Sequence, residues 1–105
     1  MVSPFPKTTY RANAEVYKVL AHPTRLEILN IMKHEEVSVE DLLRLVAVSK
    51  ANLSQHLSIL RNAGLVHVRR DGLRAFYSIM DARIIEPCRV LHELRTLNSF
   101  AAISS

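Results

Sequence analysis

The sequence has very little glycine and cysteine and no tryptophan: two glycines and one cysteine occur among 105 residues. A single cysteine cannot form a disulfide or a multi-thiolate metal site within one chain. So few glycines leave no glycine-rich loop of the kind that holds phosphate groups. No apolar run approaches the roughly 18 residues of a membrane span, and the start MVSPFPKTTYR lacks the apolar core of a signal peptide. We therefore expect a cytoplasmic protein with no membrane partner.

Hydrophobic residues make up 49% of the chain, which is enough for one compact domain of this length. The low glycine and proline content favours helices with a single hairpin. No set of nucleophile, general base and orienting group is visible, and so small a domain leaves little room for a substrate pocket. The sequence therefore predicts a protein that is not an enzyme and that uses no cofactor.

The positive charge is concentrated in one quarter of the chain. The formal net charge is +4, from 14 Lys and Arg against 10 Asp and Glu. Residues 50–74 hold five basic residues against Asp71 alone, and the rest of the chain is balanced. The five are Lys50, Arg61, Arg69, Arg70 and Arg74. A basic segment is often only a solvated face, but charge gathered in this way is typical of a nucleic-acid contact.

Helical periodicity dominates the first half of the chain. Apolar residues recur at helical spacing over residues 10–20. Pro23 suits the first turn of a second helix, and KHEEVS then has the composition of a polar connector. Ser38, with Asp41 three residues later, resembles the start of a capping box and predicts a short third helix.

The second half changes from helical to strand periodicity and back again. Ser49 is the expected N-cap of a fourth helix, and Gly64 is placed to end it in the left-handed conformation. LVHVRR and RAFYSI then alternate every second residue around Asp71 and Gly72, which predicts a hairpin. Asp81 is the expected cap of a final helix.

This order of elements predicts a mainly α fold with a small β-hairpin. Two short helices joined by a tight turn, followed by an arginine-tipped hairpin, form the plan of a winged helix-turn-helix domain. We expect a flexible N-terminal arm at residues 1–9, a DNA-binding and dimerisation domain at residues 10–99, and a flexible tail at residues 100–105.

The stretch SKANLSQHLSIL, residues 49–60, has an unusual outer face. At 100° per residue its leucines at 53, 57 and 60 form one inward stripe. The opposite face carries small and hydrogen-bonding side chains, Ala51, Gln55, Ser58 and Asn62. Amides and hydroxyls can pair with base edges, and a small residue lets a helix approach the major groove. The alternative is a merely polar surface, although ordinary solvated helix faces favour Glu and Lys.

The expected hairpin carries three arginines, Arg69, Arg70 and Arg74, around its tip. Arginines at a protruding tip suit phosphate contacts or insertion into a narrow minor groove. The alternative is a tip that only increases solubility.

Three segments, LAHPTRLEIL, VSKANLSQHLSILRNAGLV and VRRDGLRAFYSI, resemble those of the ArsR/SmtB (arsenic-repressor-type) transcriptional regulators. The resemblance covers about residues 12–98. It implies a homodimeric winged helix protein that binds double-stranded operator DNA, represses, and releases the DNA when an inducer binds. It also places Ser54, Gln55 and His56 where members of that family contact DNA. By its phase His56 leans inward, so a phosphate contact and a core role both stay open.

Helix face, hairpin tip and resemblance together give one set of expected DNA contacts. These are Ser49, Lys50, Asn52, Ser54, Gln55, His56, Ser58, Arg69, Arg70 and Arg74. The contrasting hypothesis is a winged helix adaptor that binds another protein and no DNA; such an adaptor would be expected to have lost the arginine cluster.

Apolar residues near both ends of the chain predict a dimer interface. The expected interface residues are Val16, Tyr17, Leu20, Ile84, Ile85, Cys88, Leu91 and Leu94. In a domain this small, such a seam exceeds what its own core can cover, and the resemblance favours a homodimer. An intramolecular core role for the same residues is the alternative.

No metal site is expected in this sequence. Metal-sensing relatives carry a Cys-x-Cys box where this chain reads EVSVEDL, with Ser38 and Glu40 in place of the thiolates. A second family site begins at a position that Asp81 matches, but Arg83 stands where a histidine is expected. Cys88 and His92 remain a possible inter-subunit sensing pair, although a lone cysteine is commonly a small buried hydrophobe.

Overall fold

The elements follow the expected order, with one additional strand. The computed structural model describes residues 1–97, so the expected domain boundary at residue 99 and the expected tail at residues 100–105 lie outside the described residues. The helices are α1 (Lys7–Leu20), α2 (Pro23–Ile31), α3 (Val39–Leu45), α4 (Lys50–Asn62), the 3-10 helix η1 (Ala82–Ile85) and α5 (Glu86–Thr96). The strands are β1 (Val37–Ser38), β2 (Val66–Asp71) and β3 (Arg74–Ile79).

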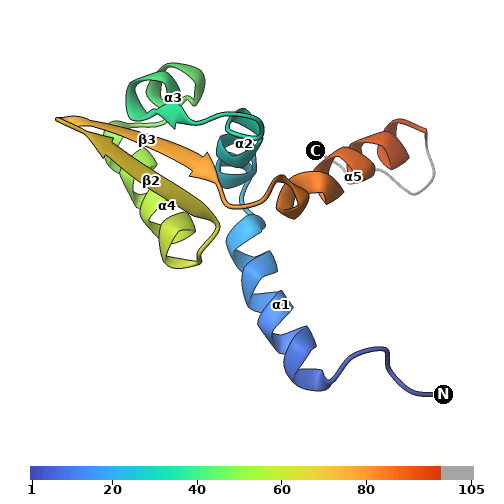
Figure 1. Cartoon of the computed structure of the whole chain (residues 1–105). Coiled ribbons are helices and arrows are strands. Elements are labelled where there is room, and N and C mark those ends of the chain that lie inside the picture. Colours follow the sequence, from blue (N-terminus) through green and yellow to red (C-terminus); the bar gives the residue numbers. More distant parts are fainter. Residues whose placement is uncertain (98–105) are drawn as a thin grey trace.

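The hydrophobic core lies where α2, α3 and α4 pack together and against the sheet (Figure 1). Its buried side chains are Ile28, Leu29, Met32, Leu42, Val46, Leu53, Leu57, Leu60, Leu65, Val66, Tyr77 and Ile85. Burying a leucine or isoleucine contributes about 1.5–3 kcal/mol each. In contrast, α1 and α5 contain no fully buried residue and project from this body in different directions.

The sheet has three antiparallel strands in the order β1-β3-β2, where the sequence predicted a two-stranded hairpin. The extra strand β1 lies in the segment expected to be a polar connector, and Val37 and Ser38 pair with Tyr77 and Phe76. The hairpin itself is confirmed, but Asp71 ends β2 and pairs with Arg74. Its two-residue loop is therefore residues 72–73, and Gly72 takes the positive φ of 62° that this turn requires.

Local capping fixes the ends of α3 and α4 as the sequence predicted. The Ser38 hydroxyl accepts from the Asp41 amide at 3.1 Å, and the Ser49 hydroxyl accepts from the Asn52 amide at 3.1 Å. At the other end of α4, Gly64 has φ 75° and donates its amide to the Arg61 carbonyl at 3.0 Å. These bonds satisfy backbone groups that the helix itself leaves unpaired.

Two helix boundaries differ from the expectation. Helix α1 begins at Lys7, three residues earlier than predicted, after Pro6 in the extended conformation. The predicted final helix is broken: Asp81 caps η1, and α5 starts only at Glu86. Pro87 explains the break, because it has no amide hydrogen to donate to the carbonyl four residues earlier, and its ring clashes with that carbonyl.

Candidate nucleic-acid interface

Helix α4 presents three distinct faces. Leu53, Leu57 and Leu60 are buried and hold the helix against the body of the domain. On the far side, Ala51 and Gln55 are exposed and no other element covers them. The inward stripe therefore lies as the sequence predicted, and Asn62 is also exposed as expected. Ser58, expected on the same outer face, is instead half-buried and lines the cleft between α4 and the hairpin. This outer face can approach a base edge without moving a core residue.

His56 lies on the flank of α4 that faces α2. Its Nδ1 accepts a hydrogen bond from Arg25 Nε at 3.2 Å, and its ring lies 4.6 Å from the ring of His22 between centroids. His22 in turn caps α2 by accepting from the Thr24 amide at 3.2 Å. Burial, His22 and Arg25, in that order, lower the pKa of His56 below its ordinary 6.5. This half-buried histidine joins two helices, which is the packing role that the sequence left open.

The hairpin arginines divide between its two faces, although the sequence treated them as one group. Arg69 and Arg74 lie on the outer face, with their guanidinium carbons 4.5 and 4.9 Å from the centroid of the Phe76 ring. Arg69 also forms an ion pair with Glu36 at 2.6 Å, which lowers the pKa of that carboxyl. Arg74 Nε lies 3.8 Å from Glu40. Both arginines thus have a carboxylate partner, Glu36 beside β1 and Glu40 on α3.

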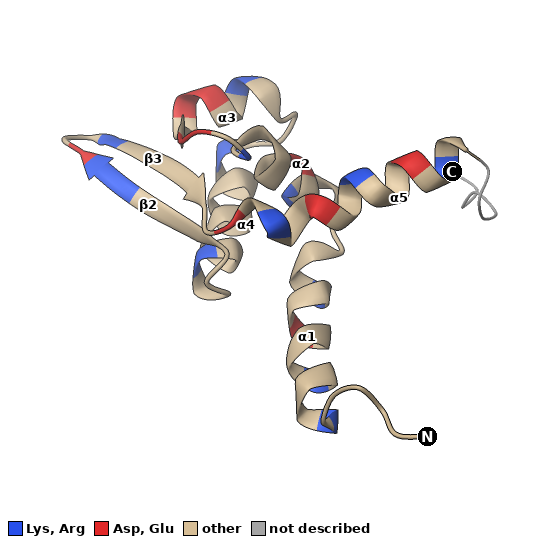
Figure 2. Cartoon of the chain, turned by 45° about the vertical axis from the view of Figure 1, so that its right-hand side comes forward, with Lys and Arg blue, Asp and Glu red and all other residues tan. Residues whose placement is uncertain are grey.

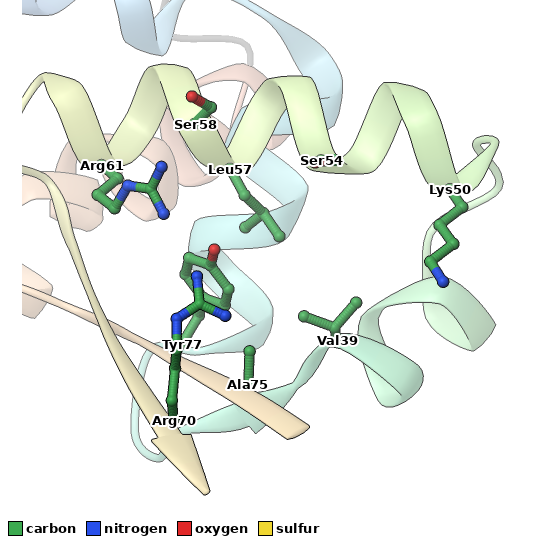
Figure 3. A pocket seen from close by; sticks show the side chains of 9 residues that line it. All are labelled: Val39, Lys50, Ser54, Leu57, Ser58, Arg61, Arg70, Ala75 and Tyr77. Atoms are coloured by element: carbon green, nitrogen blue, oxygen red, sulfur yellow. The ribbon is translucent and has the colours of Figure 1, made fainter. Parts of the chain in front are cut away.

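Arg70 alone of the three points toward α4. It lines a cleft of about 330 Å³ between α4 and the hairpin, and Figure 3 shows its side chain extending from the strand toward α4. The lining residues are Val39, Lys50, Ser54, Leu57, Ser58, Arg61, Arg70, Ala75 and Tyr77. One wall of the cleft is therefore the face of α4 that adjoins Ala51 and Gln55. The opposite wall is the β2–β3 hairpin, the wing of the domain, and it contributes Arg70.

Arg61 is a site residue that the sequence analysis counted only as charge. It stands eleven residues after Lys50, which is three helical turns and returns to the same face of α4. The spacing of Lys50 and Arg61 in the sequence indicates that they share one face of α4. That this face borders a cleft follows only from the position of the hairpin in the structure. Figure 2 shows the resulting charge pattern, with basic residues near the tip of both strands of the hairpin and acidic residues in the first turn of α3.

The residues expected at a dimer interface divide into exposed and buried ones. Tyr17, Leu91 and Leu94 are exposed by 64, 52 and 37% on α1 and α5. Val16, Leu20 and Ile84 are half-buried and pack against the core. Ile85 differs from the expectation: it is 2% exposed, because η1 turns its side chain into the core of its own chain. Among the residues expected at the interface, the most exposed side chains are therefore on α1 and α5.

A groove of about 540 Å³ connects the exposed apolar faces of α1 and α5. Tyr17, Leu20 and Leu91 line it, together with the proposed sensing pair Cys88 and His92. Cys88 is half-buried. Within residues 1–97, no three His, Cys, Asp or Glu side chains come together as potential ligands of one metal ion. Nor does any helix in this part of the chain have the length and apolar character to cross a membrane.

Known proteins resemble this chain in sequence over most of its length. A family model described as bacterial regulatory protein, arsR family, matches residues 22–68. The HTH-type transcriptional regulator Rv0081 of Mycobacterium tuberculosis is 40% identical over 97 residues, covering 90% of this chain and 85% of that protein. The biofilm growth-associated repressor of Xylella fastidiosa is 33% identical over 86 residues, covering 80% of this chain and 75% of that protein.

Solved structures resemble the whole arrangement of elements. The crystal structure of Rv0081 is similar with a TM-score of 0.74 and 39% identity, covering 93% of this chain and 97% of that one. The solution structure of the homodimeric winged helix-turn-helix DNA-binding domain of Mb0332 from Mycobacterium bovis is similar with a TM-score of 0.76 and 27% identity, covering 99% and 98%. The chain therefore belongs to the arsR family of winged helix-turn-helix transcriptional regulators.

Proposed function

We propose that this chain is a sequence-specific DNA-binding repressor that acts as a homodimer. The observation that carries the proposal is the outer face of α4, where exposed Ala51 and Gln55 adjoin a cleft lined by Lys50, Arg61 and Arg70. An amide on a helix can read the edge of an adenine in the major groove, and the neighbouring cations supply affinity for the phosphate backbone.

Two copies are needed because one reading helix covers only a few base pairs. Regulators of this kind present two such helices about one turn of DNA, roughly 34 Å, apart. The exposed apolar side chains of Tyr17, Leu91 and Leu94 supply a surface on which two copies can join. The homodimeric state given for the Mb0332 domain supports the same assembly, and the name of the Xylella repressor supports repression.

Binding to DNA from upstream of its own gene tests the proposal. We expect tight binding to a duplex within that region, and weaker binding to a scrambled duplex of equal length and composition. Affinity should fall steeply with salt, since each neutralised phosphate releases counterions and contributes a slope of about −0.9 in log affinity against log salt. Equal, salt-insensitive binding to both duplexes, or no binding, would contradict the proposal and favour a protein-binding adaptor.

Release from DNA is proposed to follow an inducer or redox signal that acts at the α1–α5 groove. Cys88 and His92 are one helical turn apart on α5 and both line this groove. A change at either side chain would act directly on the surface assigned to dimerisation. Release of the bound duplex should be screened with metals, oxidants and sulfur species, and repeated with C88S. A signal that releases wild type and C88S equally would exclude Cys88 as the sensor.

A further inference from the structure

The cleft between α4 and the hairpin gathers cations from both of its walls. Lys50 and Arg61 come from the two ends of α4, and Arg70 comes from β2 on the opposite wall. Figure 3 shows the side chain of Arg70 extending from the hairpin toward α4, which carries Arg61. Like charges that line one cleft repel, and the repulsion is relieved when an anion lies between them.

The described residues supply no such anion. Within residues 1–97, neither Lys50, Arg61 nor Arg70 forms an ion pair, whereas the arginines on the outer face are paired with Glu36 and Glu40. The floor of the cleft is apolar, formed by Val39, Leu57 and Ala75, and carries no carboxylate. Hydroxyl groups of Ser54, Ser58 and Tyr77 are the other polar side-chain groups in the lining. Cations and hydroxyls without a carboxylate suit a phosphate.

The position of the cleft identifies which phosphates these are. When α4 lies in the major groove and the hairpin reaches the neighbouring minor groove, one sugar-phosphate strand separates the two elements. That strand must cross the space between α4 and β2. Lys50 and Arg61 on α4 lie on one side of this path, and Arg70 on β2 lies on the other side.

We propose that Arg61 and Arg70 clamp a single DNA strand between α4 and the wing, with Lys50 on a neighbouring phosphate of the same strand. Arg69 and Arg74 take no part, because they lie on the opposite face of the hairpin and are held by carboxylates. This inference rests on the proposed DNA-binding function and assigns the phosphate contacts within it. Compared with the DNA contacts expected from the sequence, it adds Arg61, in the last turn of α4, and removes Arg69 and Arg74.

Matched glutamine variants test the clamp. Each substitution removes one phosphate contact from each protomer of the proposed homodimer. We therefore expect R61Q and R70Q each to lower the magnitude of the salt slope by about 2 and to weaken binding to specific and scrambled duplexes alike. The double variant should lower the magnitude of the slope by about 4. R69Q removes the same charge from the other face of the same hairpin and is the control, with a salt slope that stays at the wild-type value. Slopes unchanged in R61Q and R70Q, or lowered as much in R69Q, would overturn the clamp.

Phosphate ethylation interference locates the contacts independently. Ethylation should block wild-type binding at adjacent phosphates of one strand in each half-site, and the same positions should lose their effect in R61Q and in R70Q. If the ethylation effects that disappear in R61Q and in R70Q lie on two different strands, the clamp would be overturned, although the protein would still bind DNA. Absence of any duplex binding by the wild type would instead contradict the proposed function itself. Thermal unfolding of each variant, expected to match the wild type because these side chains are exposed, confirms that folding is unaffected.

Discussion

Arg25 joins three helices through two hydrogen bonds, and His56 is its partner on α4. Its Nε donates to His56 Nδ1 at 3.2 Å, and its Nη1 donates to the Val19 carbonyl near the end of α1, also at 3.2 Å. The first bond needs a histidine nitrogen without a proton, since a protonated imidazole has no acceptor. The placement of α4 against α1 and α2 is therefore sensitive to the protonation of one side chain.

Stability should decrease as the pH falls from 7 to 5, and His56 should contribute to the decrease. Its pKa is lowered in the folded state, so the unfolded chain binds more protons near the ordinary value of 6.5. The stabilisation is complete above that value and is lost as the pH falls through it toward the lower folded-state value. Urea unfolding at intervals of pH measures the slope.

The matched comparison for this prediction is H56Q against H67Q. Glutamine keeps an oxygen that can accept from Arg25 but does not titrate, so H56Q should flatten the pH dependence between 7 and 5. His67 is exposed on β2 and touches none of these groups, so H67Q should retain the wild-type slope. The pKa values of Glu36 and Glu86 are lowered from their ordinary 4.5, and those of Asp41 and Asp81 from their ordinary 3.8, so these carboxyls lie outside this window. An unchanged slope in H56Q would contradict the role given to His56.

Loss of the N-cap of α4 should destabilise the protein by about 1 kcal/mol. In S49A the Asn52 amide loses the hydroxyl that accepts from it at 3.1 Å. S54A removes the same hydroxyl from an exposed interior position of the same helix, where alanine has the better helix propensity, and should not destabilise. Free energies of unfolding from urea titration at pH 7.5 compare the two. Equal values for both variants would show that the Ser49 cap contributes nothing.

Gln55→Ala should reduce base preference rather than general affinity for DNA. The side chain is exposed on the outer face of α4 and makes no hydrogen bond within the described part of the chain. Losing a good base contact costs about 1–3 kcal/mol at one position in each half-site. Competition between duplexes that differ at single base pairs measures the preference, with binding to a scrambled duplex as reference. An equal loss on specific and scrambled DNA would show that Gln55 does not read sequence.

Charge placed on the apolar face of α5 should dissociate the homodimer. L91E puts a carboxylate on the α1–α5 groove, and we expect the dissociation constant of the dimer to rise by at least about tenfold, since an unpaired buried charge is strongly unfavourable. Leu45 is similarly exposed, by 59%, but lies on α3, so L45E is the matched control and should remain a dimer. Sedimentation equilibrium over a range of concentrations gives both constants. A monomeric wild type would contradict the proposed assembly.

Short-range features were predictable because their causes are local in the sequence. The caps at Ser38 and Ser49, the left-handed stop at Gly64 and the inward leucines of α4 each depend on residues within a few positions of one another. The hairpin was predictable for the same reason. Its turn lies one residue later than expected, because the Gly72 conformation suits the first central position of a two-residue loop.

Other features depend on partners distant in the sequence. Strand β1 exists because Val37 reaches the edge of β3, forty residues later, and no local pattern in so short a segment indicates this pairing. Likewise, an alternating strand pattern gives the relative faces of Arg69 and Arg70 but not which of them meets α4. The ion pair of Arg69 with Glu36 joins residues 33 positions apart.

The sequence by itself determined that the fourth helix has a polar outer face, that the hairpin carries arginines and that the Cys-x-Cys pair of metal-sensing relatives is missing, because periodicity, composition and motif spacing are properties of neighbouring residues. Only the tertiary structure decided that Ile85 belongs to the core, that His56 packs against Arg25, and that Arg70 faces α4. Each of these depends on which elements pack together, and packing is decided by the burial of apolar surface over the whole domain.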